Sequence, residues 1–150
     1  MYGTLLVPLD GSEVAECTLA HTIAIAQKFQ VPNVILLKVD EPFKPGWGVS
    51  EEVSVFPEIM QRTQDESKAY LAKKAASLKQ DGINAKTVLL KGNAADEILL
   101  YSDRNKIDLI ILATHGRTGF ARWAMGSVAD RIVRHSKVPV MLVPPAGCRA

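Results

Sequence analysis

Apolar residues along the chain fall into short runs separated by longer segments with a helical period. The short runs, rich in β-branched residues, are Thr4–Leu9, Val34–Val39, Ala85–Leu90, Leu109–Ala113 and Val138–Val143. Leu109–Ala113 is continuously apolar and shows no alternation with polar residues, which is typical of a strand buried on both faces. The pattern therefore predicts five strands in one buried sheet.

The segments between these runs carry helical patterns. The expected helices are Ser12–Phe29, Asp65–Gln80, Asn93–Asn105 and Ser127–His135. Gly82 stands just beyond the second of them, where a C-terminal stop belongs. Asn93 and Asp96 have the spacing of an N-terminal cap and its partner at the start of the third. These signals place the ends of two helices independently of the apolar pattern.

Strands that alternate with helices require crossover connections, and so a parallel sheet with helices on both faces. We therefore expect an α/β fold: a single-domain, open, Rossmann-like sheet of five parallel strands spanning residues 1–150. The segment at about 40–57 contains several prolines and glycines and has no usable period. A gap of this length is typical of a functional lid or a mobile loop, and the sequence leaves both open. Residues 145–150 are expected to form a short tail.

Composition narrows the class of protein. The chain has 150 residues, of which 47% are hydrophobic and 23% charged, as in soluble domains with a packed core. A net charge of +2 is too even for direct nucleic-acid binding. No apolar run approaches the roughly 18 residues of a membrane span. Cys17 and Cys148 are too few for a disulfide framework, and no signal-peptide pattern precedes the first strand, so we expect a reducing, cytoplasmic location.

In an open parallel sheet, ligands bind beyond the carboxyl ends of the strands. The segment after the fourth expected strand contains Gly116, Gly119 and Gly126, and Ser127 follows at the start of a helix. Glycines let backbone N–H groups approach a ligand closely, and a helix N-terminus attracts anions. The alternative is that the glycines only shape a turn and that Ser127 only caps its helix. We favour a phosphate site.

Other candidate groups have two interpretations each. Asp10, after the first strand, is suited to bind ribose hydroxyls or a metal ion, but Asp10 and Glu13 also have the spacing of a helix cap. His115 could assist phosphate chemistry or simply donate a hydrogen bond. The histidines and cysteines lack metal-ligand spacing, and the sequence assigns no metal ligand. The motifs of a P-loop, a dinucleotide fingerprint and a nucleophile elbow are absent from the sequence.

Three separated motifs resemble the universal stress protein family. They are Val7-Pro8-Leu9-Asp10-Gly11-Ser12, then Ala113-Thr114-His115-Gly116-Arg117-Thr118-Gly119 followed by Gly126-Ser127-Val128-Ala129, and finally Val138-Pro139-Val140-Met141-Leu142-Val143. They occur in the family's order and extend from residue 3 to about residue 144. The resemblance implies the strand order 3-2-1-4-5 and binding of ATP or AMP, with Mg²⁺ or Mn²⁺, in stress response or regulation. It also implies a homodimer that pairs through Val138–Val143.

The resemblance also assigns roles to residues. Pro8 and Asp10 would flank the adenosine, and Val39 would meet the adenine through its backbone. The family's phosphate pattern, Gly-x2-Gly-x9-Gly-Ser/Thr, falls on Gly116, Gly126 and Ser127, but Ala113 occupies its first position. The expected ligand contacts are Pro8, Asp10, Val39, Ala113, His115, Gly116, Arg117, Gly119, Gly126, Ser127 and Val128.

Three functional hypotheses follow. The first is a nucleotide-binding dimer without fast catalysis, and no catalytic residue is assigned. The second is a slow ATPase with the same site, for which His115 or Asp10 would have to act on water. The third is a protein-interaction module that no longer binds nucleotide, and Ala113 is the feature that favours it.

Overall fold

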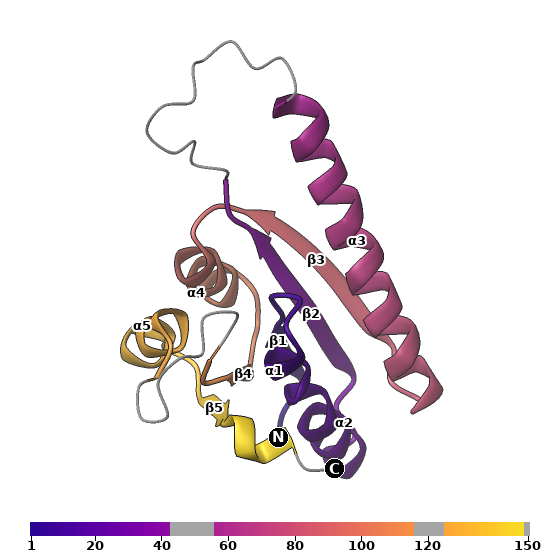
Figure 1. Ribbon diagram of the computed structural model, residues 1–150. Coiled ribbons are helices and arrows are strands. Elements are labelled where there is room, and N and C mark those ends of the chain that lie inside the picture. The colour runs from indigo at the N-terminus through magenta and orange to yellow at the C-terminus, as the bar shows by residue number, and fades with distance from the viewer. Residues whose placement is uncertain (43–55, 116–124, 149–150) are drawn as a thin grey trace.

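Strands and helices alternate along the chain in the computed structural model, which describes residues 1–42, 56–115 and 125–148 (Figure 1). The strands are β1 (Thr4–Pro8), β2 (Asn33–Asp40), β3 (Ala85–Lys91), β4 (Leu109–Ala113) and β5 (Val140–Val143). The helices are α1 (Glu13–Glu16), α2 (Thr18–Phe29), α3 (Phe56–Gln80), α4 (Ala94–Arg104) and α5 (Ser127–His135), followed by the 3₁₀ turn η1 (Pro145–Cys148). No helix within these described ranges is long and apolar enough to cross a membrane.

The strands form one parallel sheet in the order β3-β2-β1-β4-β5. β1 lies at the centre, where Leu6 pairs with Ile35 of β2 and with Ile110 of β4. The chain order therefore reverses at β1, and a crevice opens between the carboxyl ends of β1 and β4. The predicted α/β fold and strand order are confirmed.

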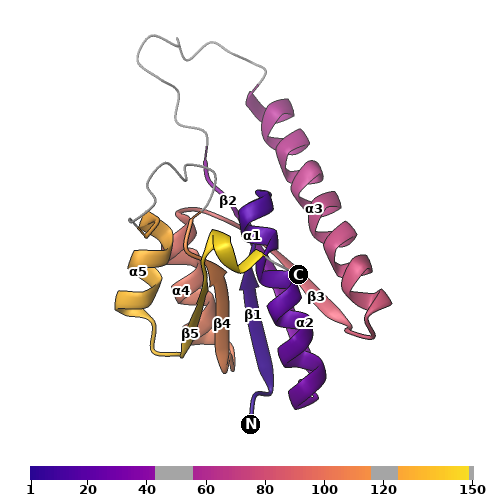
Figure 2. The ribbon, with the colours of Figure 1, turned by 60° about the horizontal axis from the view of Figure 1, so that its bottom comes forward.

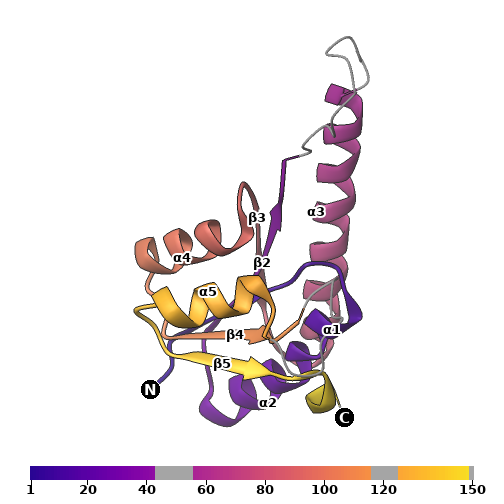
Figure 3. The same cartoon turned by 60° about the vertical axis from the view of Figure 1, so that its left-hand side comes forward.

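Helices cover both faces of the sheet (Figure 3). On one face, side chains of the central strands pack against α2 and α3; this cluster includes Leu5, Val7, Leu36, Leu71 and Leu78. On the other face they pack against α4 and α5, in a cluster that includes Leu6, Leu37, Ile98, Ile110 and Ile132. Neighbouring positions of a strand point to opposite faces, so two covered faces require the continuous apolar runs seen in the sequence.

Both helix-end signals are confirmed. After α3, Gly82 adopts φ +78°, which glycine reaches without strain, and Ile83 N–H donates to the Leu78 carbonyl at 3.0 Å. At the start of α4, the Asn93 side chain accepts a hydrogen bond from Asp96 N–H at 3.2 Å. Each contact satisfies a backbone group that the helix leaves unpaired at its end.

Several expected boundaries were wrong. The expected helix Ser12–Phe29 is two helices that meet at Cys17. The helix α3 begins at Phe56 rather than Asp65, and residues 57–63 are exposed, so no apolar stripe marked its first turns. β2 continues to Asp40, which shortens the expected irregular segment, and residues 43–55 lie outside the described ranges. β5 begins at Val140, because Pro139 lacks an N–H group for the sheet.

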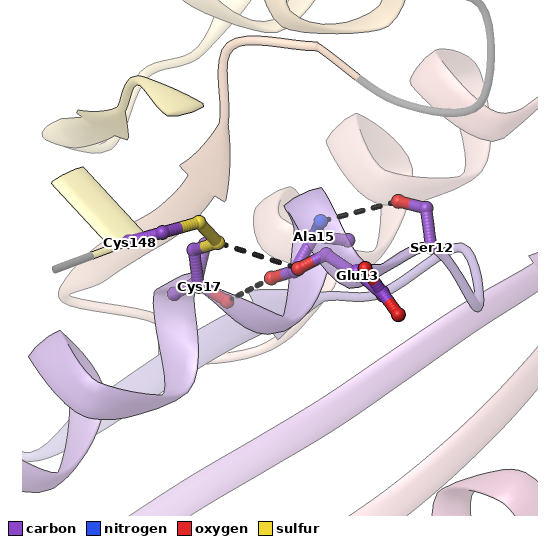
Figure 4. Close-up of a disulfide and its surroundings, with 6 residues drawn as sticks. Ser12, Glu13, Ala15, Cys17 and Cys148 are labelled. Carbon is purple, nitrogen blue, oxygen red and sulfur yellow. Dashed lines mark hydrogen bonds between the residues drawn. A yellow bond between two sulfur atoms is a disulfide. The ribbon is translucent and has the colours of Figure 1, made fainter. Parts of the chain in front are cut away.

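The two cysteines form one disulfide between the α1–α2 junction and the C-terminal 3₁₀ turn, a pairing that the sequence analysis did not predict. Cys17 lies at the junction of α1 and α2, and Cys148 ends η1, 131 positions later (Figure 4). The 3₁₀ turn lies beside α1 (Figure 2). The segment expected to be a short tail is therefore attached to the fold, up to Cys148.

Candidate functional site

A pocket of about 730 Å³ opens at the carboxyl ends of β1, β2 and β4. Eight of the expected ligand contacts line it: Pro8, Asp10, Val39, Ala113, His115, Gly126, Ser127 and Val128. Gly116, Arg117 and Gly119 lie outside the described residues. The structure thus collects residues from three strands and α5 in one pocket, and their contact with a ligand remains a prediction.

Gly126 lines the pocket between the end of β4 and the start of α5. Its N–H group donates to the Thr114 carbonyl at 2.7 Å, and a Cβ atom at this position would lie 3.0 Å from that oxygen. The close approach of two backbone segments therefore favours glycine, although its φ of −59° is ordinary. The first turn of α5 is brought against the end of β4, so its unpaired N–H groups lie at the pocket.

Ser127 is the first residue of α5, and the cap position belongs to Gly126, which makes no side-chain cap bond. The interpretation of Ser127 as only a helix cap is therefore wrong. Its exposed side chain lines the pocket beside the helix N-terminus. A hydroxyl in that position can donate to an anion that the helix end attracts.

His115 follows the end of β4, and its two ring nitrogens have different surroundings. Nδ1 lies 2.9 Å from the Thr114 hydroxyl oxygen. Nε2 is buried and has no hydrogen-bond partner among the residues described. Burying such an atom unpaired costs about 1–3 kcal/mol, so a pocket ligand that supplies a partner would be stabilised here.

Asp10 follows β1 at the centre of the pocket. Its Oδ1 accepts from the Ser12 backbone N–H at 2.9 Å and from the Ser12 hydroxyl at 2.5 Å. The Ser12 oxygen in turn accepts from Ala15 N–H at 3.1 Å and caps α1. The cap is therefore Ser12, and the alternative of an Asp10–Glu13 cap pair is wrong. Asp10 orients this cap with one carboxylate oxygen, and the second can face a ligand.

The backbone of Val39 is directed to the crevice. Leu37 accepts from Leu9 N–H on the β1 side at 2.8 Å, and Asp40 accepts from Gly92 N–H on the β3 side at 3.1 Å. Successive residues of a strand present their N–H and C=O groups to opposite sides. Val39 therefore presents its own groups to the β1 side, beyond the point where β1 has ended.

A charged cluster that the sequence analysis missed closes the other end of the pocket. Asp40 Oδ1 accepts from Lys38 Nζ at 2.6 Å and from the Ser67 hydroxyl of α3 at 2.7 Å. Asp40 Oδ2 is buried without a partner in the described part of the chain. Lys38 and Asp40 are polar at alternate positions after an apolar run, and this signal could have shown that they share one face.

Tyr70 and Lys74 of α3 hold α1 in place. The Tyr70 hydroxyl donates to Glu16 Oε1 at 3.1 Å, and Lys74 Nζ donates to Glu16 Oε2 at 2.5 Å. Burial, and next the neighbouring Glu16 carboxylate, raise the pKa of the Tyr70 hydroxyl above its ordinary value. The hydroxyl therefore stays protonated and remains a donor at neutral pH.

The described residues of the pocket provide hydrogen-bond donors and acceptors but no cluster of metal ligands. No group of three or more histidine, cysteine, aspartate and glutamate side chains suited to a metal ion occurs in the described ranges. Its polar groups are instead spread along the pocket: a helix N-terminus and His115 at β4, Asp10 at β1, and Asp40 at β2. This arrangement fits an elongated ligand with an anionic end and a donor-bearing end.

Comparisons with known proteins agree on one family. The profile of the universal stress protein family matches residues 1–144. The universal stress protein MJ0531 of Methanocaldococcus jannaschii is 32% identical over 143 residues, covering 95% of this chain and 82% of its own.

Solved structures show the same likeness. UspA of Lactobacillus plantarum superimposes with a TM-score of 0.81 at 25% identity, over 94% of this chain and 97% of its own. Protein MJ0577, also of Methanocaldococcus jannaschii, superimposes with a TM-score of 0.81 at 28% identity, over 96% of each chain. Family profile, relatives and fold all span nearly the whole chain. The chain therefore belongs to the universal stress protein family.

Proposed function

We propose that this protein binds an adenine nucleotide, ATP or AMP, in the pocket and acts in stress response or regulation. The observation that carries the proposal is the order in which polar groups lie along the pocket. An anion-attracting helix N-terminus, the Asp10 carboxylate and the Val39 main chain lie along one crevice of about 730 Å³. Two buried atoms without a hydrogen-bond partner in the described chain, His115 Nε2 and Asp40 Oδ2, would be stabilised by hydrogen-bonding groups of a ligand.

The order of these groups sets the ligand's direction. α5 follows β4, Asp10 follows β1, and Val39 lies at the end of β2, and these strands are neighbours in the order β4, β1, β2. Strands are about 4.8 Å apart, so the outer two groups are separated by roughly 10 Å across the sheet edge. Phosphates at α5, ribose at Asp10 and base at Val39 would follow this line.

Other proteins of this fold support the ligand class. One solved universal stress protein is in complex with cAMP, and one from Arabidopsis thaliana has AMP bound. They are 21% and 18% identical to this chain, so their likeness concerns the fold. The residues of this pocket are the support for a nucleotide in this chain.

A divalent cation would enter with the nucleotide. Because the described residues offer no acidic cluster, Mg²⁺ or Mn²⁺ would be held chiefly by the phosphates. We assign the protein no fast catalysis. Slow ATP hydrolysis is a second candidate, favoured by His115 Nε2, a nitrogen at the phosphate end with no described partner.

The proposal includes a cytoplasmic homodimer, and a reducing cytoplasm would hold Cys17 and Cys148 as thiols. Among the described strands β5 pairs only with β4, so its outer edge is available for the matching strand of a second copy. Light scattering coupled to size-exclusion chromatography should give twice the monomer mass of 16.3 kDa. A monomer at micromolar concentration would contradict the dimer.

Calorimetric titration of the nucleotide-stripped protein with ATP and Mg²⁺ tests the site. We expect saturable binding, and binding that weakens strongly in Asp10→Ala. Asp103→Ala, at the opposite end of α4 from the pocket-lining Ala94, is the matched control and should bind as the parent does. Absence of binding at millimolar ATP would overturn the proposal and favour an interaction module, and a product assay in the same samples decides between binding and hydrolysis.

A further inference from the structure

Asp40 is a buried carboxylate that the fold satisfies only on one side. Its side chain is 9% exposed, and that of its partner Lys38 is 12% exposed. Lys38 Nζ and the Ser67 hydroxyl both donate to Oδ1, whereas Oδ2 has no partner among the described residues. An ionised carboxylate can only accept hydrogen bonds, so whatever satisfies Oδ2 must be a donor.

Asp40, the residue that carries this acceptor, lines the pocket at a distance from the anion-binding end at α5. Asp40, Lys38 and Ser67 all line the pocket. Asp40 ends β2, two strands away from β4, where α5 presents its N-terminus. A ligand whose phosphates lie at α5 therefore brings its other end, the base, toward Asp40.

The geometry points to Asp40 as a base-reading residue, whose Oδ2 accepts a hydrogen bond from the 6-amino group of adenine. This inference rests on the proposed function and names what would select the base. An amino group supplies the required donor, whereas a 6-oxo purine presents an acceptor in the same position and would face the carboxylate unfavourably.

The engagement of Oδ1 also disfavours guanine. Guanine presents two neighbouring donors, N1–H and the 2-amino group, which a carboxylate satisfies best with both of its oxygens. Here Lys38 and Ser67 already occupy Oδ1, so only one oxygen is available. A single available acceptor fits the single amino substituent of adenine.

Nucleotide analogues test the inference on the unaltered protein. Affinities for ATP and for purine riboside triphosphate, which lacks only the 6-amino group, are compared by calorimetry. We expect the analogue to bind about 10- to 100-fold more weakly, because a hydrogen bond to a charged group is lost. 2′-Deoxy-ATP and 3′-deoxy-ATP, titrated in parallel, report on contacts of the sugar.

The variant Asp40→Asn provides a second test, because it replaces a hydrogen-bond acceptor at this position by a donor. The amide oxygen should face the donors Lys38 and Ser67, which places the amide NH₂ group where Oδ2 lies now. The position then donates instead of accepting, so the preference for ATP over inosine triphosphate should fall at least tenfold or reverse. Asp103→Asn, an exposed aspartate paired with Lys137, is the matched charge control and should keep the preference of the parent.

The possible results separate the inference from the proposed function. If ATP does not bind at all, the proposed function fails, and the inference with it. If ATP and purine riboside triphosphate bind equally, the nucleotide site stands but base reading by Asp40 is overturned. If affinity depends on a sugar hydroxyl and that dependence disappears in Asp40→Asn, Asp40 contacts the ribose and the inference is also overturned.

Discussion

The two ends of the pocket are built from different kinds of groups. At the end of β4, the contacts available to a ligand come largely from backbone N–H groups at the N-terminus of α5, which the close approach of Gly126 to Thr114 brings to the pocket. At the end of β2, the distinctive group is a side chain, Asp40, which Lys38 and Ser67 hold by one oxygen. One end thus offers diffuse positive potential, and the other a single acceptor in a fixed position.

This difference separates affinity from selectivity. A helix N-terminus attracts any anion and does not distinguish what is attached to it. A buried acceptor rewards one matched donor and penalises every ligand that lacks it, because the acceptor is then left unpaired. We therefore expect the β4 end to determine how tightly nucleotides bind, and the β2 end to determine which nucleotide binds.

The largest expected effect acts on both ends together. The Cys17–Cys148 disulfide attaches η1, which follows β5, to the junction after α1, whose cap Asp10 orients. Reducing it, or replacing both cysteines by serine, should lower the free energy of unfolding by about 2–4 kcal/mol, since it closes a long loop. Urea denaturation with and without dithiothreitol measures this loss.

The serine variant, which lacks the disulfide in either buffer, is the control and should show no further change with reductant. Under conditions in which the serine variant remains folded, its ratio of ATP affinity to purine riboside triphosphate affinity should equal that of the native protein. A changed ratio would mean that the two ends are not independent of this anchor.

Gly126→Val should weaken the β4 end alone. A side chain there would press on the Thr114 carbonyl, 3.0 Å from the Cβ position, and move the N-terminus of α5. We expect all nucleoside triphosphates to lose about 10- to 100-fold in affinity by similar factors, measured by calorimetry. Gly126→Ala should show a smaller loss, and melting temperatures identify any variant that is unfolded. A loss confined to one base would contradict the division between the two ends.

The smallest effect concerns α3, which carries Ser67 to the β2 end. The Tyr70 hydroxyl donates to Glu16, and its raised pKa means that the folded state keeps a proton that the unfolded chain releases above about pH 10. This contribution to stability is complete below that pH and is lost as pH rises further. The free energy of unfolding should therefore fall less between pH 8 and 10.5 in Tyr70→Phe than in the parent, by about 1 kcal/mol at most. An equal fall in both proteins would contradict this.

The β4 end was largely predictable from the sequence, and the β2 end was not. Gly126 and Ser127 are adjacent, follow a recognisable buried strand and belong to a family motif, so their neighbourhood is encoded locally. Asp40 falls in the expected irregular segment because the apolar run ends at Val39, and only the alternation of Lys38 and Asp40 indicates that β2 continues. Its partner Ser67 lies 27 positions away, on a helix whose beginning the apolar pattern also missed.

Local sequence is enough to predict the alternation of strands and helices, the stop at Gly82 and the cap at Asn93, because each depends on residues within one or two helical turns. Three features became visible only in the folded chain: the pairing of Cys17 with Cys148, the capping of α1 by Ser12 and not by Asp10, and the contact between Asp40 and Ser67. Contacts across long separations depend on where crossover helices return to the sheet. That position follows from the packing of whole faces and not from any local pattern.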